Sequence, residues 1–348
     1  MVSILLAGCD SNEYIEIKDA VIFNDKSFKE VKMLSHTDID TEFIGNPVRM
    51  TKVDTFLYIV DSSIDSVVHL FDVKNNLYRG LMVGRGTGPN ELLSSGYVHP
   101  SPDNQFVWLY DITGRQWVKY GKANVGKISV MTEKIRFVKD TFATMTVEDP
   151  VWISDSLFVC VNLNSFKERF YFFDRQLKHK PVYNPRFSFK KNAPDFVLNE
   201  MFSILLNVKP DKSKIVLGGR YFDCLEVYHS SGILSTLTKG PEKGFNFNYD
   251  RQRSYARGAM IKSPETRRAY LCLKSTDERI YALYSGKEKQ DVSNYSNSDV
   301  VFTFDWEGKP LTKYVLDCQI ISFDVDENNK KIYAIREPEK SIIYFDLN

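Results

Sequence analysis

The stretch that decides the fold is Phe56–Leu92, which reads FLYIVDSSIDSVVHLFDVKNNLYRGLMVGRGTGPNEL. Three short apolar segments, 56–60, 66–71 and 77–83, are separated by polar turns, and a glycine-rich loop, 84–91, follows them. Short apolar runs bounded by polar turns are typical of β-strands. A sheet of three strands cannot bury its own faces, so this unit predicts a fold in which similar sheets are repeated and stacked.

The same strand ending recurs along the chain. The second segment of the opening stretch ends in an aromatic residue, and similar endings follow at intervals of 41 to 76 residues, at Phe71, Tyr120, Phe173, Tyr228, Phe304 and Phe345. A further strand precedes most of these endings and another follows many of them, so each unit is expected to be a four-stranded antiparallel meander. The aromatic content of 14% also favours β-structure.

The two ends of the chain predict how the repeats close. Only three residues follow Phe345, so the last unit lacks an outer strand, whereas segment 28–34 is a spare strand near the N-terminus. Pairing this spare strand with the last sheet would remove an exposed edge. The sequence therefore predicts an all-β fold over residues 13–348: one domain, a six-bladed β-propeller of four-stranded antiparallel blades, closed by an N-terminal strand that completes the last blade.

Other architectures fit the pattern less well. A β-sandwich would not need six similar units, and helical repeats are disfavoured because few segments show a 3.6-residue apolar period. The best helical candidate is 193–205, residues 36–40 are expected to form a turn, and the polar stretch 286–299 is expected to be a mobile loop on one rim.

Composition excludes some partners. The chain carries 46 basic and 45 acidic side chains, a net charge of +1 that leaves no footprint for nucleic acid. No basic block indicates an electrostatic membrane patch, and no segment approaches the roughly 18 apolar residues of a transmembrane helix. The thiols of Cys160 and Cys272 lie in strand-like segments, which favours buried cysteines, while the disulfide status of Cys160, Cys224, Cys272 and Cys318 stays open.

The fifth cysteine, Cys9, lies in a different context. The sequence Leu6-Ala7-Gly8-Cys9 resembles a bacterial lipobox, in which a large apolar residue and two small ones precede the cysteine that is acylated. We therefore expect residues 1–12 to be a signal remnant and tether, with a mature protein that starts at Cys9 and is lipid-anchored. No basic residue precedes the short apolar run, so the true start is expected upstream; a chance apolar stretch is the alternative.

The glycine-rich loop 84–91 invites comparison with phosphate-binding loops. It lacks the Gly-Lys-Ser/Thr ending and the following helix of a Walker loop, and its spacing does not fit a dinucleotide-binding turn. A connection between blades, with glycines at positive φ, is the favoured interpretation. Arg85, Thr87, Asn90 and Glu91 stay as candidate binding residues.

A second candidate group lies in the basic and aromatic segment RQRSYAR at 251–257. Arg253, Tyr255 and Arg257 are candidates for a rim patch that binds an anionic ligand, and a solvated loop is the alternative.

Motifs that would define an enzyme or a metal site are missing from the sequence. Residues 324–328 resemble the start of an EF-hand, but Asn329 and Ile335 stand where the calcium loop needs Gly and Glu, so a hairpin turn is expected. The five histidines are scattered without HExxH or HxH spacing. No catalytic residue and no cofactor is therefore predicted, and a calcium or other divalent ion at the pore stays an open alternative.

Three phrases resemble a known family. GRGTGPNEL at 84–92, RIYALYSGK with VFTFDWEGKPLTKYVLD, and the ending ISFDVDENNKKIYAIREPEKSIIYFDL are similar to the TolB-like six-bladed propeller lipoproteins, which are related to NHL-type propellers. The resemblance covers 13–348 and departs from the family at Asn90, where glycine is common. It implies a lipid-anchored protein of the bacterial cell envelope and carries over no catalytic residues.

The leading hypothesis is a monomeric, lipid-anchored propeller that binds a protein partner or a small-molecule or glycan ligand at its rim or pore. Nucleic acid is not expected as a partner, and the membrane only through the N-terminal anchor. The alternative is a pore-centred, metal-assisted hydrolase or lyase acting on a lactone or glycan, and a pure scaffold is a third possibility.

Overall fold

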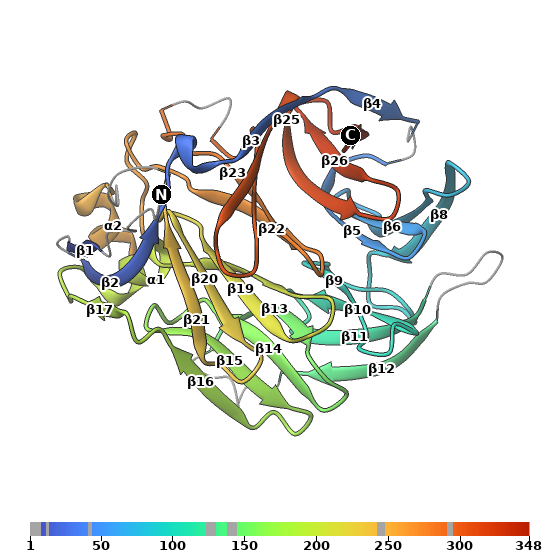
Figure 1. Ribbon diagram of the computed structural model, residues 1–348. Helices are drawn as coiled ribbons and strands as arrows, with labels where there is room; N and C mark the ends of the chain where they lie inside the picture. Colours follow the sequence, from blue (N-terminus) through green and yellow to red (C-terminus); the bar gives the residue numbers. More distant parts are fainter. Residues whose placement is uncertain are drawn as a thin grey trace. The chain divides into compact units, whose positions relative to one another are not determined.

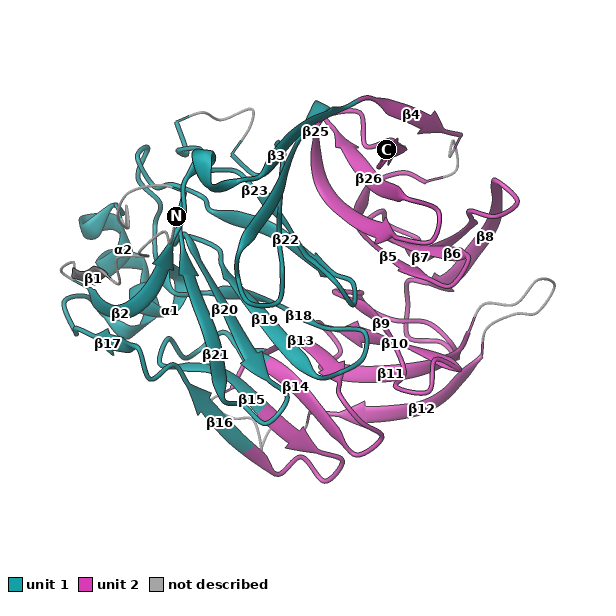
Figure 2. Cartoon of the chain, in the orientation of Figure 1, with its two compact units in different colours: residues 1–34, 161–171, 180–317 teal, residues 35–160, 172–179, 318–348 magenta. Residues whose placement is uncertain are grey.

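The computed structural model describes residues 14–40, 44–122, 130–137, 145–241, 248–290 and 295–347, together with the backbone of residues 8–11. The chain divides into two compact units (Figure 2). Unit 1 comprises residues 1–34, 161–171 and 180–317, and unit 2 comprises residues 35–160, 172–179 and 318–348.

Unit 2 begins with two four-stranded antiparallel sheets (Figure 1). The strands of the first sheet, in order, are β5 (Pro47–Val53), β6 (Phe56–Asp61), β7 (Ser66–Asp72) and β8 (Leu77–Gly84). Those of the second are β9 (Val98–Pro100), β10 (Phe106–Asp111), β11 (Gln116–Gly121) and β12 (Met131–Arg136). The opening stretch therefore forms three strands of one meander, and its repeat is confirmed by the next sheet.

The last sheet of unit 2 joins the two ends of the chain. It contains the second part of β25 (Pro310–Asp326), followed by β26 (Lys331–Glu337), β27 (Ile342–Asp346) and β4 (His36–Ile39). β4 pairs antiparallel with β27, and Ile39 lies opposite Ile342. An N-terminal strand does complete the last sheet, but it is His36–Ile39, which the sequence predicted to be a turn.

The predicted closing segment 28–34 has another place. β3 (Glu30–Leu34) pairs in parallel with Thr312–Leu316 of β25, inside unit 1. The ring of Phe28 stacks on Phe302 with centroids 4.7 Å apart, and this burial fixes the segment against its own unit. The apolar residues whose alternation predicted a closing strand are exposed in this position: Val31 by 61% and Met33 by 73%.

Unit 1 contains two further sheets. One has the order β18 (Ile204–Val208), β19 (Lys214–Gly219), β20 (Cys224–His229) and β21 (Leu234–Lys239), extended by β2 (Ile15–Ile22), β1 (Gly8–Ser11) and β17 (Phe187–Phe189). The other has the order β22 (Tyr270–Ser275), β23 (Ile280–Tyr284), β24 (Ser298–Phe304) and the first part of β25. The residues of another four-stranded meander are divided between the units: β13 (Val147–Trp152), β14 (Leu157–Asn162), β15 (Glu168–Asp174) and β16 (His179–Tyr183).

Aspartates follow four of the six recurring aromatic strand endings, Phe71, Phe173, Phe304 and Phe345. Asp72 accepts hydrogen bonds from the backbone amides of Lys74 and Asn75, and Asp305 does the same for the turn that follows it. Such side chains satisfy backbone donors in tight turns. Asp326 accepts from the amide of Asn329 at 3.2 Å, so the EF-hand-like segment is the hairpin turn that was predicted.

Two short helices interrupt the strands of unit 1. α1 (Asp195–Met201) confirms a helix within the predicted segment 193–205, whose last two residues belong instead to β18. α2 (Arg251–Arg257) replaces the loop that was the alternative for RQRSYAR. A 3-10 turn, η1 (Asp25–Ser27), precedes β3. Of the expected mobile loop 286–299, residues 291–294 lie outside the described part of the chain.

The cysteines in strands differ in exposure. Cys160 in β14 and Cys224 in β20 are buried, and burial raises the pKa of both thiols. Cys272 lies in β22 as expected but is only partly buried. Cys9 lies in β1, and its side chain is outside the described residues.

Candidate functional site

The glycine-rich loop is stabilised by its own charged residues. The Arg85 guanidinium donates to the carbonyl oxygens of Ser63 at 3.2 Å, Ser66 at 3.2 Å and Leu93 at 2.6 Å. Glu91 accepts from the amide of Gly88 at 2.8 Å. These contacts use the donors and acceptors that a phosphate or a sugar would need, so Arg85 and Glu91 support the loop itself.

The loop glycines are required for space and not for a positive φ. A Cβ at Gly86 would lie 2.0 Å from the Glu91 carboxylate, and one at Gly88 would lie 2.9 Å from it. The residue at positive φ is Asn90, at 63°, and its side-chain oxygen accepts from the amide of Met131 at 2.9 Å. The predicted connection between sheets is confirmed, whereas the predicted reason for its glycines is wrong.

Of the four candidates in this loop, Thr87 is the one that stays exposed. The structure brings Arg85, Asn90 and Glu91 together as parts of one connection. It does not converge them on a cavity.

The second candidate group lies on helix α2. Asp250 caps the helix by accepting from the amide of Arg253 at 2.9 Å, and Gly258 ends it at a φ of 63°. Every residue of α2 is exposed except Ser254. Arg253, Tyr255 and Arg257 therefore lie on one small protruding helix.

A polar cluster that the sequence did not indicate lies near the end of α1. The Glu200 carboxylate accepts from the hydroxyl of Tyr221 and from the ammonium of Lys262, both at 3.0 Å. Arg268 donates to the Tyr221 oxygen at 2.6 Å, and its guanidinium carbon lies 4.9 Å from the centre of the same ring. Four side chains, separated by up to 68 positions, thus form one network.

The protonation of this cluster follows from its contacts. Burial alone would raise the pKa of Glu200, but the charge of Lys262 and the hydrogen bonds from Lys262 and Tyr221 lower it overall. Burial alone would lower the pKa of Lys262, but Tyr221 and Glu200 raise it overall. Glu200 is therefore an anion and Lys262 a cation at neutral pH.

Two donors are buried without a partner in the described part of the chain: the Nε of Arg268, and the hydroxyl of Tyr295, a fifth member that interacts electrostatically with Tyr221, Arg268 and Glu200. Burial raises the pKa of Tyr295, which Tyr221 and Glu200 raise further and Arg268 opposes. Buried polar groups are nearly always hydrogen-bonded, so exceptions need an explanation. An acceptor that is not part of the protein is one such explanation.

A further polar set lies on the first strands of three sheets in unit 2. Arg49 of β5 lies 4.5 Å from the ring centre of Tyr97, whose hydroxyl donates to Glu148 of β13 at 2.9 Å. His99 of β9 lies 2.5 Å from a carboxylate oxygen of Asp149. The His99–Asp149 pair offers acid and base groups, but the two side chains are hydrogen-bonded to each other.

A hydrogen-bonded chain crosses the first sheet. His69 Nε2 lies 3.1 Å from Asp61, and His69 Nδ1 lies 2.7 Å from the Tyr78 hydroxyl. A neutral imidazole has one donor and one acceptor, so Nε2–H donates to the carboxylate and Nδ1 accepts from Tyr78. Asp61 also accepts from the backbone amides of Gly45 and Asn46. This hydrogen-bonded network therefore fixes the residues that lead into β5.

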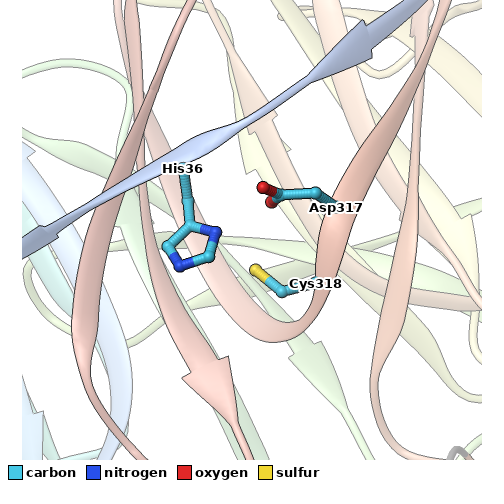
Figure 3. A group of neighbouring side chains, drawn as sticks. All are labelled: His36, Asp317 and Cys318. Carbon is cyan, nitrogen blue, oxygen red and sulfur yellow. The ribbon is translucent and has the colours of Figure 1, made fainter.

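Among the described residues, one group could offer ligands to a metal ion. A nitrogen of His36 lies within 4.8 Å of the sulfur of Cys318, and Figure 3 shows both with Asp317, which precedes Cys318 in β25. Arg336 lies 2.8 Å from His36 Nε2. Arginine can only donate, so Nε2 accepts and Nδ1 carries the proton. Protonated Nδ1 has no lone pair to offer a metal ion, and the positive charge of Arg336 repels one. Both disfavour a cation at this position.

The sheets and their capped turns define a β-propeller. A family model described as TolB-like 6-blade propeller-like matches residues 25–328, and the chain belongs to this family. No curated protein matches the sequence.

Solved structures share the fold at low identity. A candidate exported protein from Bacteroides fragilis is 12% identical with a TM-score of 0.58, covering 93% of this chain and 98% of its own. A member of the DUF4221 family from Bacteroides vulgatus is 13% identical with a TM-score of 0.58, covering 97% and 98%. The WD40 repeats of RRP9 are 8% identical with a TM-score of 0.54, covering 90% and 97%. At these identities the likeness supports the propeller fold alone.

Within the ranges that the structure describes, neither helix is long and apolar enough to cross a membrane.

Proposed function

We propose that this protein is an exported, lipid-anchored binding propeller whose ligand site is the polar cluster of Glu200, Tyr221, Lys262, Arg268 and Tyr295. The observation that carries this proposal is the pair of buried donors without partners, Arg268 Nε and the Tyr295 hydroxyl. A buried donor left unpaired costs about 1–3 kcal/mol, which a ligand with acceptor groups would recover.

The charges of the cluster favour a small ligand with an acidic group. Lys262 and Arg268 are cations, Tyr295 adds a neutral donor, and Glu200 is the single anion that faces them. Charged donors bind carboxylates and other anions more strongly than they bind neutral acceptors. A sugar acid or a similar small acid supplies both the charge and the hydroxyl groups that a polar site can hold.

The ligand site is tested by substituting Tyr295→Phe, which removes one orphan hydroxyl and keeps the ring. We expect the thermal midpoint without ligand to stay equal or rise by about 2 °C, because an unpaired buried group is lost. Galacturonate as a probe should stabilise the unmodified protein and bind the variant at least about tenfold more weakly. Galactose is the neutral control, and Tyr255→Phe, on an exposed ring, is the control variant.

Two results would contradict this proposal. One is binding of galacturonate by Tyr295→Phe with unchanged affinity. The other is a clear loss of stability in that variant without any ligand, which would show that the hydroxyl is already satisfied in the free protein.

The lipid anchor at Cys9 is the second part of the proposal. It is supported by the Leu-Ala-Gly-Cys sequence. Expressed with a complete signal sequence, the unmodified protein should fractionate with membranes and Cys9→Ser should be released. If the variant stays with membranes after a high-salt wash, the acylation hypothesis is wrong.

A further inference from the structure

Helix α2 carries a local concentration of positive charge. Residues 251–257 contain three arginines and no acidic side chain, and the capping Asp250 has its carboxylate 3.9 Å from Arg253. Arg251, Arg253 and Arg257 are all exposed on α2; Arg253 and Arg257 lie four residues apart on one face, and the ring of Tyr255, on the other side of the helix, is 58% exposed. Arginine and tyrosine side chains suit a membrane interface, because both join an apolar body to a polar end.

The chain segment that would carry the anchor lies next to this helix. The carbonyl oxygen of Tyr14 accepts from the amide of Lys190 at 2.7 Å, five residues before α1 begins. α1 in turn contacts α2 through Phe196 and Tyr255, whose ring centres lie 6.4 Å apart. The pKa of the exposed Arg251 is raised by Tyr249 and by Tyr14, as expected for a guanidinium beside both rings.

Cys9 precedes Tyr14 by five residues, a separation that spans at most about 18 Å even when extended. Its backbone belongs to β1, which pairs with β2, so that Asp10 lies opposite Ile17. Figure 1 shows β1, β2 and α2 grouped on the same side of unit 1. The proposed acylation site and the basic helix therefore lie in the same region of unit 1.

We propose that the exposed face of α2 docks on an anionic membrane surface, with phospholipid headgroups as its occupant. This inference rests on the proposed lipid anchor, which would hold α2 within reach of the headgroups. Basic side chains beside an anchor add electrostatic attraction to the insertion of acyl chains and orient the protein on the surface. Phosphodiester groups match the three exposed guanidinium groups in charge and in hydrogen-bonding geometry.

The test uses the full chain with Cys9→Ser, so that no acyl chain contributes. Vesicles of phosphatidylcholine alone are compared by flotation with vesicles containing about one-third phosphatidylglycerol. We expect binding to the anionic vesicles only, with loss of binding in about 0.5 M NaCl, where the screening length shrinks to about 4 Å.

A double substitution locates the contact. Each basic residue near an anionic surface contributes about fivefold to partitioning, so Arg253→Gln with Arg257→Gln should weaken binding about 25-fold. The matched control is Lys134→Gln with Arg136→Gln, two exposed basic residues of β12 in unit 2. All four side chains are exposed, and circular dichroism should confirm that the fold is unchanged.

Three outcomes overturn the docking proposal. They are equal binding to neutral and anionic vesicles, equal weakening by the two double substitutions, and binding to an acidic polysaccharide such as heparin without any binding to anionic vesicles. None of them depends on acylation. A failed anchor would appear in the cellular fractionation of Cys9→Ser, so failure of the proposed function and failure of this inference are distinguishable.

Discussion

The buried ion pair between Arg169 and Glu226 gives the sharpest stability prediction. Both side chains are about 1% exposed, and two guanidinium nitrogens lie 2.7–3.2 Å from the carboxylate oxygens. The remaining nitrogen donates to the carbonyl oxygen of Phe202 at 3.2 Å. Asn184 and Tyr228 donate to the second carboxylate oxygen at 2.8 Å and 2.7 Å. The network thus joins β15 to β20 inside unit 1.

The cost of breaking the pair follows from what each substitution leaves behind. Arg169→Met keeps most of the volume but leaves the Glu226 carboxylate buried with two neutral donors. Glu226→Leu leaves a buried guanidinium whose main acceptor is gone. Removing one partner of a buried pair typically costs about 3–5 kcal/mol. The double substitution removes both charges and leaves the donors of Asn184 and Tyr228 unpaired, at about 1–3 kcal/mol each, so we expect a loss of about 2–6 kcal/mol.

The assay is a double-mutant cycle in urea, followed by circular dichroism and by tryptophan fluorescence. Trp306 is buried in unit 1, whereas Trp108, Trp117 and Trp152 are buried in unit 2, so fluorescence reports on both units and circular dichroism on the whole chain. The two single losses sum to about 6–10 kcal/mol, and the double loss should be several kcal/mol smaller, which gives a large coupling energy. Additive losses, or a cost below about 1 kcal/mol for Arg169→Met, would refute the reasoning.

Two further predictions concern unit 2. Burial lowers the pKa of His69 although Asp61 opposes it, and hydrogen bonds from Ser63 and the backbone outweigh burial to lower the pKa of Asp61. Both groups favour folding in their deprotonated forms, so the free energy of unfolding should fall below about pH 6.5 and again below about pH 4. In urea unfolding across pH, His69→Gln should lose the first decline and keep the second; an unchanged profile would contradict this assignment. In the loop, Gly86→Ala should be moderately destabilising alone but tolerated in a Glu91→Ala background, because the added Cβ displaces the Glu91 carboxylate from its hydrogen bond with the Gly88 amide. Equal melting-point losses for Gly86→Ala in both backgrounds would argue against that contact.

The fold was predictable because its signals are local and repeated. Each repeat has an apolar strand and an aromatic strand ending, most of these endings are followed by an aspartate at the turn, and these features lie close together in sequence. The closing strand was predicted wrongly because its place depends on Phe28, whose ring stacks on Phe302. Apolar alternation in β3 is the same whether the strand closes the last sheet or lies exposed beside β25.

The candidate site was mostly invisible in the sequence. α2 has a single buried residue, Ser254, so it shows no apolar period that could indicate a helix. Glu200, Tyr221, Lys262 and Arg268 belong to segments that meet only in the folded unit. Arg85 and Glu91 were selected for their charge, but in the structure this charge is used by the loop itself.

The pairing of β4 with β27 has a consequence for the order in which the chain is made. Arg336 and His36 meet in this sheet although 300 positions separate them. If the proposed export proceeds from the N-terminus, β4 has no pairing partner until nearly the whole chain has crossed the membrane. An unpaired strand can pair with other chains, and native edge strands limit this risk by being short and polar. β4 has four residues, of which Thr37 and Asp38 are exposed. Its brevity and its exposed polar residues limit such pairing before the sheet closes.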